Sequence, residues 1–152
     1  MQTSLDPRTH AFRPDLADIR LQGRVQAAHF VTGQMARVAS ARLAMFSTPQ
    51  PQAAMSSELR VGEFVDVFER VNGIAWVQNR SDHYVGYVAE AGLAETIADP
   101  AWRIANLQAY VYPEPTVKAV PVDLLAFPGR VAVAANLPNG WSRLCAPRGP
   151  IW

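Results

Sequence analysis

Two segments of this chain, residues 35–95 and 102–152, carry the same order of apolar, turn and glycine positions, and this repeat limits the possible folds. The matching positions, at an offset of 66 and then 67 residues, include Phe46 with Tyr112, Leu59 with Leu125, and Gly73 with Gly140. Domains of about 60 residues can fold alone, so the repeat predicts two small domains rather than one medium one. Chance similarity between two β-rich stretches is the alternative.

Each segment has the pattern of short strands. In the first segment, residues 42–46, 64–68, 73–78 and 84–88 are rich in β-branched and aromatic side chains. Asn72-Gly73 is a strong hairpin signal, and Asn139-Gly140 repeats it in the second segment. Five short strands with one long loop after the first describe an SH3-like barrel, whose closure removes exposed edges. We therefore expect an all-β fold with two tandem SH3-like barrels, residues 35–95 and 102–152.

A polar, proline-containing lead-in, residues 1–34, precedes the first barrel. Pro14 suits the first position of a short helix, in which Leu16, Ile19 and Leu21 could line one side. Residues 24–31 fit a strand or a helix equally well. These side chains and Phe30 need burial, so we expect the irregular or helical lead-in to pack on the first barrel. A linker is expected near residues 96–100.

The second segment lacks part of the repeat. If Trp152 matches Tyr87, the second copy has no counterpart of residues 88–93. The second barrel is then open, covered by a partner, or C-terminally truncated, and we favour truncation.

Charge and composition exclude several classes of protein. The chain is 49% hydrophobic, with 14 basic and 13 acidic side chains that show no basic stripe, so we expect no nucleic-acid partner. No run of 18 apolar residues exists, and we expect no membrane span. A single cysteine and the absence of an apolar core after the first residues favour the cytoplasm. A periplasmic location is the alternative if a signal is missing upstream.

Few residues of the types used in catalysis or metal binding show a functional pattern. Cys145 is followed by seven residues, none of them a histidine, so no base is expected to activate it. The three histidines have no metal-ligand spacing with each other or with Cys145. We expect no metal and no cofactor. We read Cys145 as a half-buried strand residue, and we disfavour an enzyme that uses it.

The lead-in and first barrel resemble bacterial NlpC-type cysteine peptidases, the cell-wall hydrolases of dipeptidyl-peptidase type. The resemblance rests on seven stretches: Asp6-Pro7-Arg8, residues 11–17, residues 21–25, Phe30-Val31, Gly62-Glu63, residues 73–77, and Tyr84-Val85-Gly86-Tyr87-Val88. In that family a lead-in precedes two bacterial SH3 domains, and a papain-like catalytic domain follows. Its nucleophile lies in an Asp-Cys-Ser-Gly motif, whereas this chain has Leu144-Cys145-Ala146. The resemblance therefore implies a non-catalytic region that would partner such a catalytic domain.

The resemblance also implies a role for the first barrel. In the family this domain narrows the catalytic cleft, and a glutamate and a tyrosine lie near the free amine of the peptidoglycan stem peptide. The matching residues are Glu63 and Tyr84, with Trp76 and Tyr87 as the next ligand-binding candidates. A carboxylate can pair with the ammonium and a phenol can hydrogen-bond beside it. The plain alternatives are a solvated turn residue for Glu63 and ring packing for the aromatics. A free-standing module that binds peptidoglycan or a protein is the other functional hypothesis.

Overall fold

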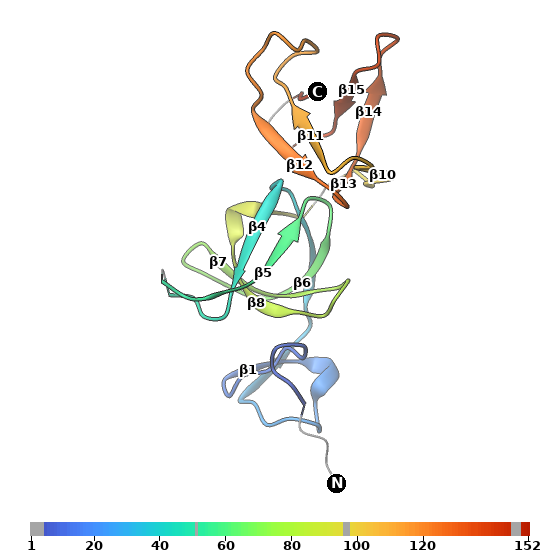
Figure 1. Cartoon of the computed structure of the whole chain (residues 1–152). Coiled ribbons are helices and arrows are strands. Elements are labelled where there is room, and N and C mark those ends of the chain that lie inside the picture. The colour runs from blue at the N-terminus through green and yellow to red at the C-terminus, as the bar shows by residue number, and fades with distance from the viewer. Residues whose placement is uncertain (1–4, 51, 96–97, 147–149) are drawn as a thin grey trace.

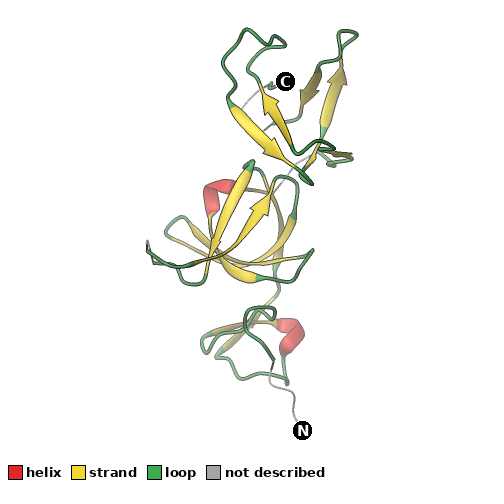
Figure 2. Cartoon of the chain, in the orientation of Figure 1, coloured by secondary structure: helices red, strands yellow, loops and turns green. Residues whose placement is uncertain are grey.

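The computed structural model describes residues 5–50, 52–95, 98–146 and 150–152. Within these ranges the chain is built almost entirely from short strands (Figure 1; Figure 2). The helical segments there are two single 3-10 turns, η1 (Ile19–Leu21) and η2 (Glu90–Gly92). The all-β fold class is confirmed. Across the part of the chain that is described, neither helix has the length or apolar character needed to cross a membrane.

The lead-in forms a small parallel pair of strands rather than a longer helix. Strand β1 (Leu16–Asp18) pairs with β2 (His29–Val31). Leu16 therefore lies opposite His29, a strand partner 13 positions further along the chain. The short helix expected after Pro14 is therefore limited to the 3-10 turn η1, and the ambiguous stretch 24–31 ends in a strand. Leu16 and Leu21 are buried, but Ile19 is 39% exposed, against our expectation.

Seven antiparallel strands form the central sheet, in the order β5-β4-β8-β7-β6-β3-β9. Their bounds are β3 (Gln34–Val38), β4 (Arg42–Phe46), β5 (Met55–Arg60), β6 (Phe64–Val71), β7 (Ile74–Asn79), β8 (Val85–Ala89) and β9 (Leu93–Ala94). Among the described residues, the edge strands β5 and β9 do not pair with one another. Closure of this sheet into a barrel stays a prediction.

Alternation of side chains along these strands directs one face into the main apolar core. Val65 and Val67 of β6 and Ala75 and Val77 of β7 point into the main apolar cluster. The other members of that cluster come from neighbouring strands: Ala36, Val38, Leu43, Met45, Leu59 and Val88. Burial of the valine, leucine and methionine side chains in this cluster stabilises the fold by about 1.5–3 kcal/mol each.

The hairpin between β6 and β7 follows the turn chemistry of the sequence. Asn72 and Gly73 have φ of 52° and 77°, as a type I′ turn requires at both central positions. Val71 and Ile74 pair directly on either side of the turn. The Asn-Gly hairpin prediction is confirmed here.

Six shorter strands follow and repeat the pairing pattern of the central sheet. They are β10 (Trp102–Arg103), β11 (Gln108–Val111), β12 (Asp123–Ala126), β13 (Arg130–Val131), β14 (Val133–Asn136) and β15 (Ser142–Leu144). The pairs β10–β13, β11–β12 and β14–β15 lie at the repeat offset from β3–β6, β4–β5 and β6–β7. Figure 1 shows this group on the side of the central sheet away from the lead-in.

The last described residues also pair as the corresponding residues of the central sheet do. The backbones of Trp152 and Tyr112 exchange two hydrogen bonds of 2.9 and 2.8 Å, as Tyr87 pairs with Phe46 in the first segment. The domain boundaries and the number of barrels stay predictions. Of the expected linker, residues 96 and 97 lie outside the described ranges.

Candidate functional site

Glu63 lies in the turn between β5 and β6, and protein donors hold its carboxylate. Oε2 accepts a 2.6 Å hydrogen bond from the backbone N–H of Arg60. Oε1 accepts hydrogen bonds from Asn79 Nδ2 at 3.3 Å and from Ser81 Oγ at 3.1 Å. A carboxylate has about four acceptor positions, so these three bonds leave one open on Oε2. Glu63 is half-buried and oriented rather than a freely solvated turn residue.

Tyr84 immediately precedes β8 and shares a neighbour with Glu63. Its carbonyl accepts a 2.8 Å hydrogen bond from the backbone N–H of Asn79, whose side chain contacts Glu63. Asn79 is 1% exposed, so it is a rigid link between the two candidates. The Tyr84 ring packs against the main apolar cluster. On the lead-in, the side-chain hydrogen bonds from Arg8 to Asp6 raise the pKa of Arg8.

Trp76 and Tyr87 are direct neighbours across β7 and β8, on a face that the lead-in covers. The Arg13 guanidinium lies 4.4 Å from the centre of the Trp76 ring, and the Phe68 ring centre lies 5.5 Å from it. Trp76 is only 4% exposed in a cluster with Ala11, Leu16 and Phe68. The structure therefore places Trp76 in a packed cluster.

Arg13 fixes the lead-in over this aromatic cluster. It donates to Glu69 at 2.7 Å, to Tyr87 Oη at 3.1 Å and to Asp15. Burial acts to lower the pKa of Arg13, but the hydrogen bonds to Asp15, Glu69 and Tyr87 outweigh it and raise the pKa. No local pattern distinguishes Arg13 in the sequence, because Glu69 and Tyr87, its partners on the sheet, are more than 50 positions away.

The Glu63 side of the sheet has its own hollow, which reaches the second group of strands. Its polar and aromatic lining consists of Glu63, Phe64, Arg80, Ser81, Asp99, Arg103, Phe127 and Arg130. Trp76 and Tyr87 line a different hollow, together with Arg13, Pro14 and Pro49. The four candidates therefore fall into two places, with Glu63 and Tyr84 around Asn79 and the other two under the lead-in.

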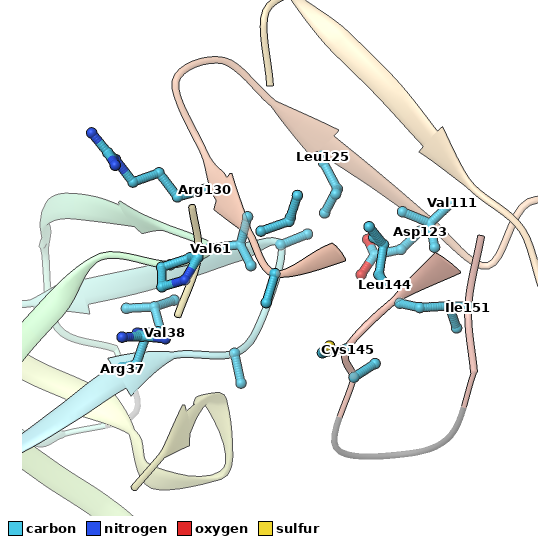
Figure 3. Close-up of a pocket in the computed structure, with 17 residues that line it drawn as sticks. Arg37, Val38, Val61, Val111, Asp123, Leu125, Arg130, Leu144, Cys145 and Ile151 are labelled. Carbon is cyan, nitrogen blue, oxygen red and sulfur yellow. The ribbon is translucent and has the colours of Figure 1, made fainter. Parts of the chain in front are cut away.

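A mainly apolar crevice lies between β3, the loop after β5, and the second group of strands (Figure 3). Val61, Val111, Leu125, Leu144 and Ile151 line it, and Cys145 lies half-buried at its rim. The Cys145 backbone N–H donates to the carbonyl of Ala132 at 2.8 Å. The described lining contains no histidine. In the described ranges, no cluster of three His, Cys, Asp or Glu side chains could hold a metal ion.

Comparison with known proteins identifies the central segment. Residues 45–93 match the family described as the bacterial dipeptidyl-peptidase SH3 domain. This segment runs from the end of β4 to the start of β9 and contains all four candidate residues. This part of the chain is therefore similar to the bacterial dipeptidyl-peptidase SH3 domain. No curated protein matches the chain.

Two solved structures, both from Trichomonas vaginalis, have weakly similar folds. NlpC2 is 16% identical with a TM-score of 0.38, over 81% of this chain and 47% of its own. NlpC1 is 17% identical with a TM-score of 0.39, over 80% of this chain and 44% of its own. This chain thus spans about half the length of either protein.

Proposed function

We propose that this chain is the substrate-gating region of a cell-wall cysteine peptidase, with an SH3 domain that binds the free amino terminus of a peptidoglycan stem peptide. The main support is the environment of Glu63, which lies in the segment that matches a dipeptidyl-peptidase SH3 domain. Three hydrogen-bond donors of the protein hold its carboxylate at the edge of a hollow. Residues 35–95 form the binding domain in this proposal, residues 1–34 support it, and residues 102–152 form a second SH3-like domain.

The chemistry of Glu63 suits an ammonium ligand. A carboxylate that is already fixed loses little conformational freedom when it pairs with a charged amine. The remaining acceptor position on Oε2 would take one N–H of the ammonium group, and a charge-assisted bond of this kind is about twice as strong as a neutral one. Tyr84 is the second residue of this proposal, and its backbone carbonyl is joined to Glu63 through Asn79.

Catalysis in this proposal belongs to a papain-like domain that partners the chain, in the cytoplasm or, as the alternative, in the periplasm. The chain itself would bind and select muropeptides. Purified chain should therefore release no product from L-alanyl-γ-D-glutamyl peptides. Turnover that disappears in Cys145→Ser would contradict this assignment.

The experiment titrates the 15N-labelled full chain with L-alanyl-γ-D-glutamyl-L-alanine amide and with its N-acetyl form. We expect the free amine to shift the backbone signals around Glu63 and Asn79, and to bind at least about tenfold more tightly than the blocked form, as expected for a charged hydrogen bond. Glu63→Gln should remove this preference, whereas Glu114→Gln, at an exposed carboxylate elsewhere, should keep it. Equal binding of both peptides by the unaltered chain would refute the proposal.

A free-standing module that binds peptidoglycan or a protein is the second candidate. Exposed aromatics on the second group of strands favour it, because Trp102, Tyr110 and Phe127 are 53, 62 and 47% exposed. Co-sedimentation with insoluble peptidoglycan separates the two. Binding that survives enzymatic removal of the stem peptides would support this candidate over recognition of the peptide amine.

A further inference from the structure

Two arginines from the second group of strands line the same hollow as Glu63. Arg103 of β10 and Arg130 of β13 are directly opposite one another in the antiparallel pair, and both are exposed. Within the described ranges, neither guanidinium pairs with a carboxylate. The third arginine of the hollow, Arg80, is already engaged in a 2.7 Å ion pair with Asp66. The hollow therefore carries two cations available to a ligand.

Backbone contacts hold this arginine pair against the turn that carries Glu63. The Arg130 N–H donates to the carbonyl of Val61 at 2.8 Å. At Gly62 an added Cβ would lie 2.3 Å from the carbonyl oxygen of Arg130, so the two backbones are in close contact. Gly62 immediately precedes Glu63. The carboxylate and the arginine pair are thus parts of one hollow with a defined arrangement.

Asp99 also lines the hollow, but no ion pair joins its carboxylate to Arg103 or Arg130 in the described ranges, so the charges of the two arginines are not neutralised by a direct partner. Like charges that are directly opposite in an antiparallel pair repel one another and destabilise the sheet. A carboxylate between two guanidinium groups would remove the repulsion and accept hydrogen bonds from their planar forks. A small peptide with both an amine and a carboxylate would match the charges on the two sides of the hollow.

We infer that the hollow takes both charged ends of the stem peptide, its amine at Glu63 and the free α-carboxylate of the γ-linked D-glutamate at Arg103 and Arg130. This inference rests on the proposed function and adds a preference for one form of the stem peptide. Stem peptides with this carboxylate are preferred over those in which it is an amide, as in D-isoglutamine. The selection uses residues of both groups of strands, so neither group alone is sufficient.

The test compares two ligands on the full chain by calorimetry: L-alanyl-γ-D-glutamyl-L-alanine amide and its α-amide counterpart. Both have a free amine, and they differ only in the carboxylate. We expect the acid to bind roughly tenfold to a hundredfold more tightly, as hydrogen bonds to a charged group predict. Added salt should weaken the binding of the acid more than the binding of the amide, because the arginines are exposed.

Substitutions locate the effect. Arg130→Gln and Arg103→Gln should each reduce the preference for the acid several-fold and leave the preference for a free amine over an N-acetyl group unchanged. Arg143→Gln removes the same charge from an exposed position on β15 and should change neither preference. Thermal unfolding of each variant checks that the fold is retained.

Different results would refute the carboxylate site at the arginines and the amine site at Glu63. If acid and amide bind equally while the N-acetyl form binds more weakly, the arginine site is refuted and the amine site at Glu63 stands. If the acid is preferred but the amine is irrelevant, the proposed function is refuted, and so is the two-ended site. Absence of binding by every peptide refutes both.

Discussion

Gly62→Ala is the substitution that tests the contact between the central sheet and the second group of strands. Gly62 has φ of +83°, and a Cβ there would lie 2.3 Å from the carbonyl oxygen of Arg130 and 2.9 Å from its carbonyl carbon. Both atoms belong to backbone, so the clash cannot be relieved by a change of rotamer. Either the turn or strand β13 must move.

The expected loss of stability has two parts. A residue with a Cβ in the left-handed region is disfavoured by about 1–2 kcal/mol. Overpacking against atoms that cannot easily shift adds typically about 1–3 kcal/mol. The sum, about 2–5 kcal/mol, is a large share of the roughly 5–15 kcal/mol by which a domain is stable.

Gly73→Ala is the matched control. Gly73 has a similar φ of +77°, but no atom lies within 4 Å of an added Cβ. Its expected loss is therefore the conformational part alone, about 1–2 kcal/mol. Urea unfolding of both variants gives the free energies, and unchanged slopes would show that the same surface is exposed on unfolding. Amide signals of Val61 and Arg130 should shift in the Gly62 variant only.

Equal losses in the two variants would refute the reasoning. They would mean that β13 can withdraw from Gly62 at no energetic cost and that the hollow beside Glu63 has no fixed arginine wall. A loss at Gly62 that exceeds the loss at Gly73, with shifts at Arg130, supports the contact.

The remaining predictions concern the lead-in. Arg13→Ala should lower the free energy of unfolding by about 1–3 kcal/mol in a urea assay, because it removes a cation–π contact and two long-range hydrogen bonds. The control Arg8→Ala, at an exposed arginine, should leave it almost unchanged. Leu16→Ala should lower it by about 2–4 kcal/mol, since this side chain is 9% exposed against an aromatic cluster; a loss under 1 kcal/mol would contradict that packing. The hydrogen bond from Arg13 lowers the pKa of Asp15 below its ordinary 3.8 more than burial raises it. The stabilisation by this pair is therefore present above that ordinary pKa and lost as pH falls through the lowered one. The melting temperature of Asp15→Asn should accordingly depend less on pH below about 4 than that of the unaltered chain, and parallel curves would count against the pair.

The parts of the fold that sequence patterns predicted are those set by local chemistry. Strands with alternating apolar residues, such as the one that holds Val65 and Val67, are encoded by residues two positions apart. The hairpin at Asn72-Gly73 is encoded by two residues that tolerate positive φ. Such signals do not depend on distant segments of the chain. The repeat also allowed each signal in residues 35–95 to be compared with its counterpart in residues 102–152.

The lead-in shows where local patterns are insufficient. Leu16 and Ile19 have a spacing that suits a helix, but β2 supplies a strand partner for Leu16, and Ile19 remains at the surface. Pairing with a segment 13 positions away outweighs a weak local preference, because a few residues of helix have little stability by themselves.

The candidate site depends even more on tertiary structure. Glu63 and Tyr84 could be named from a family resemblance, but Asn79, which joins them, has no distinguishing local pattern. Likewise, the sequence contains Arg103 and Arg130 as two ordinary charged residues 27 positions apart. Only the pairing of β10 with β13, and the close approach of β13 to Gly62, places both arginines beside Glu63. The strands and turns of the central segment could be predicted from the sequence, because they follow from neighbouring residues. The charge arrangement of the hollow was decided by contacts between segments far apart in the chain, which exist only after the strands have packed.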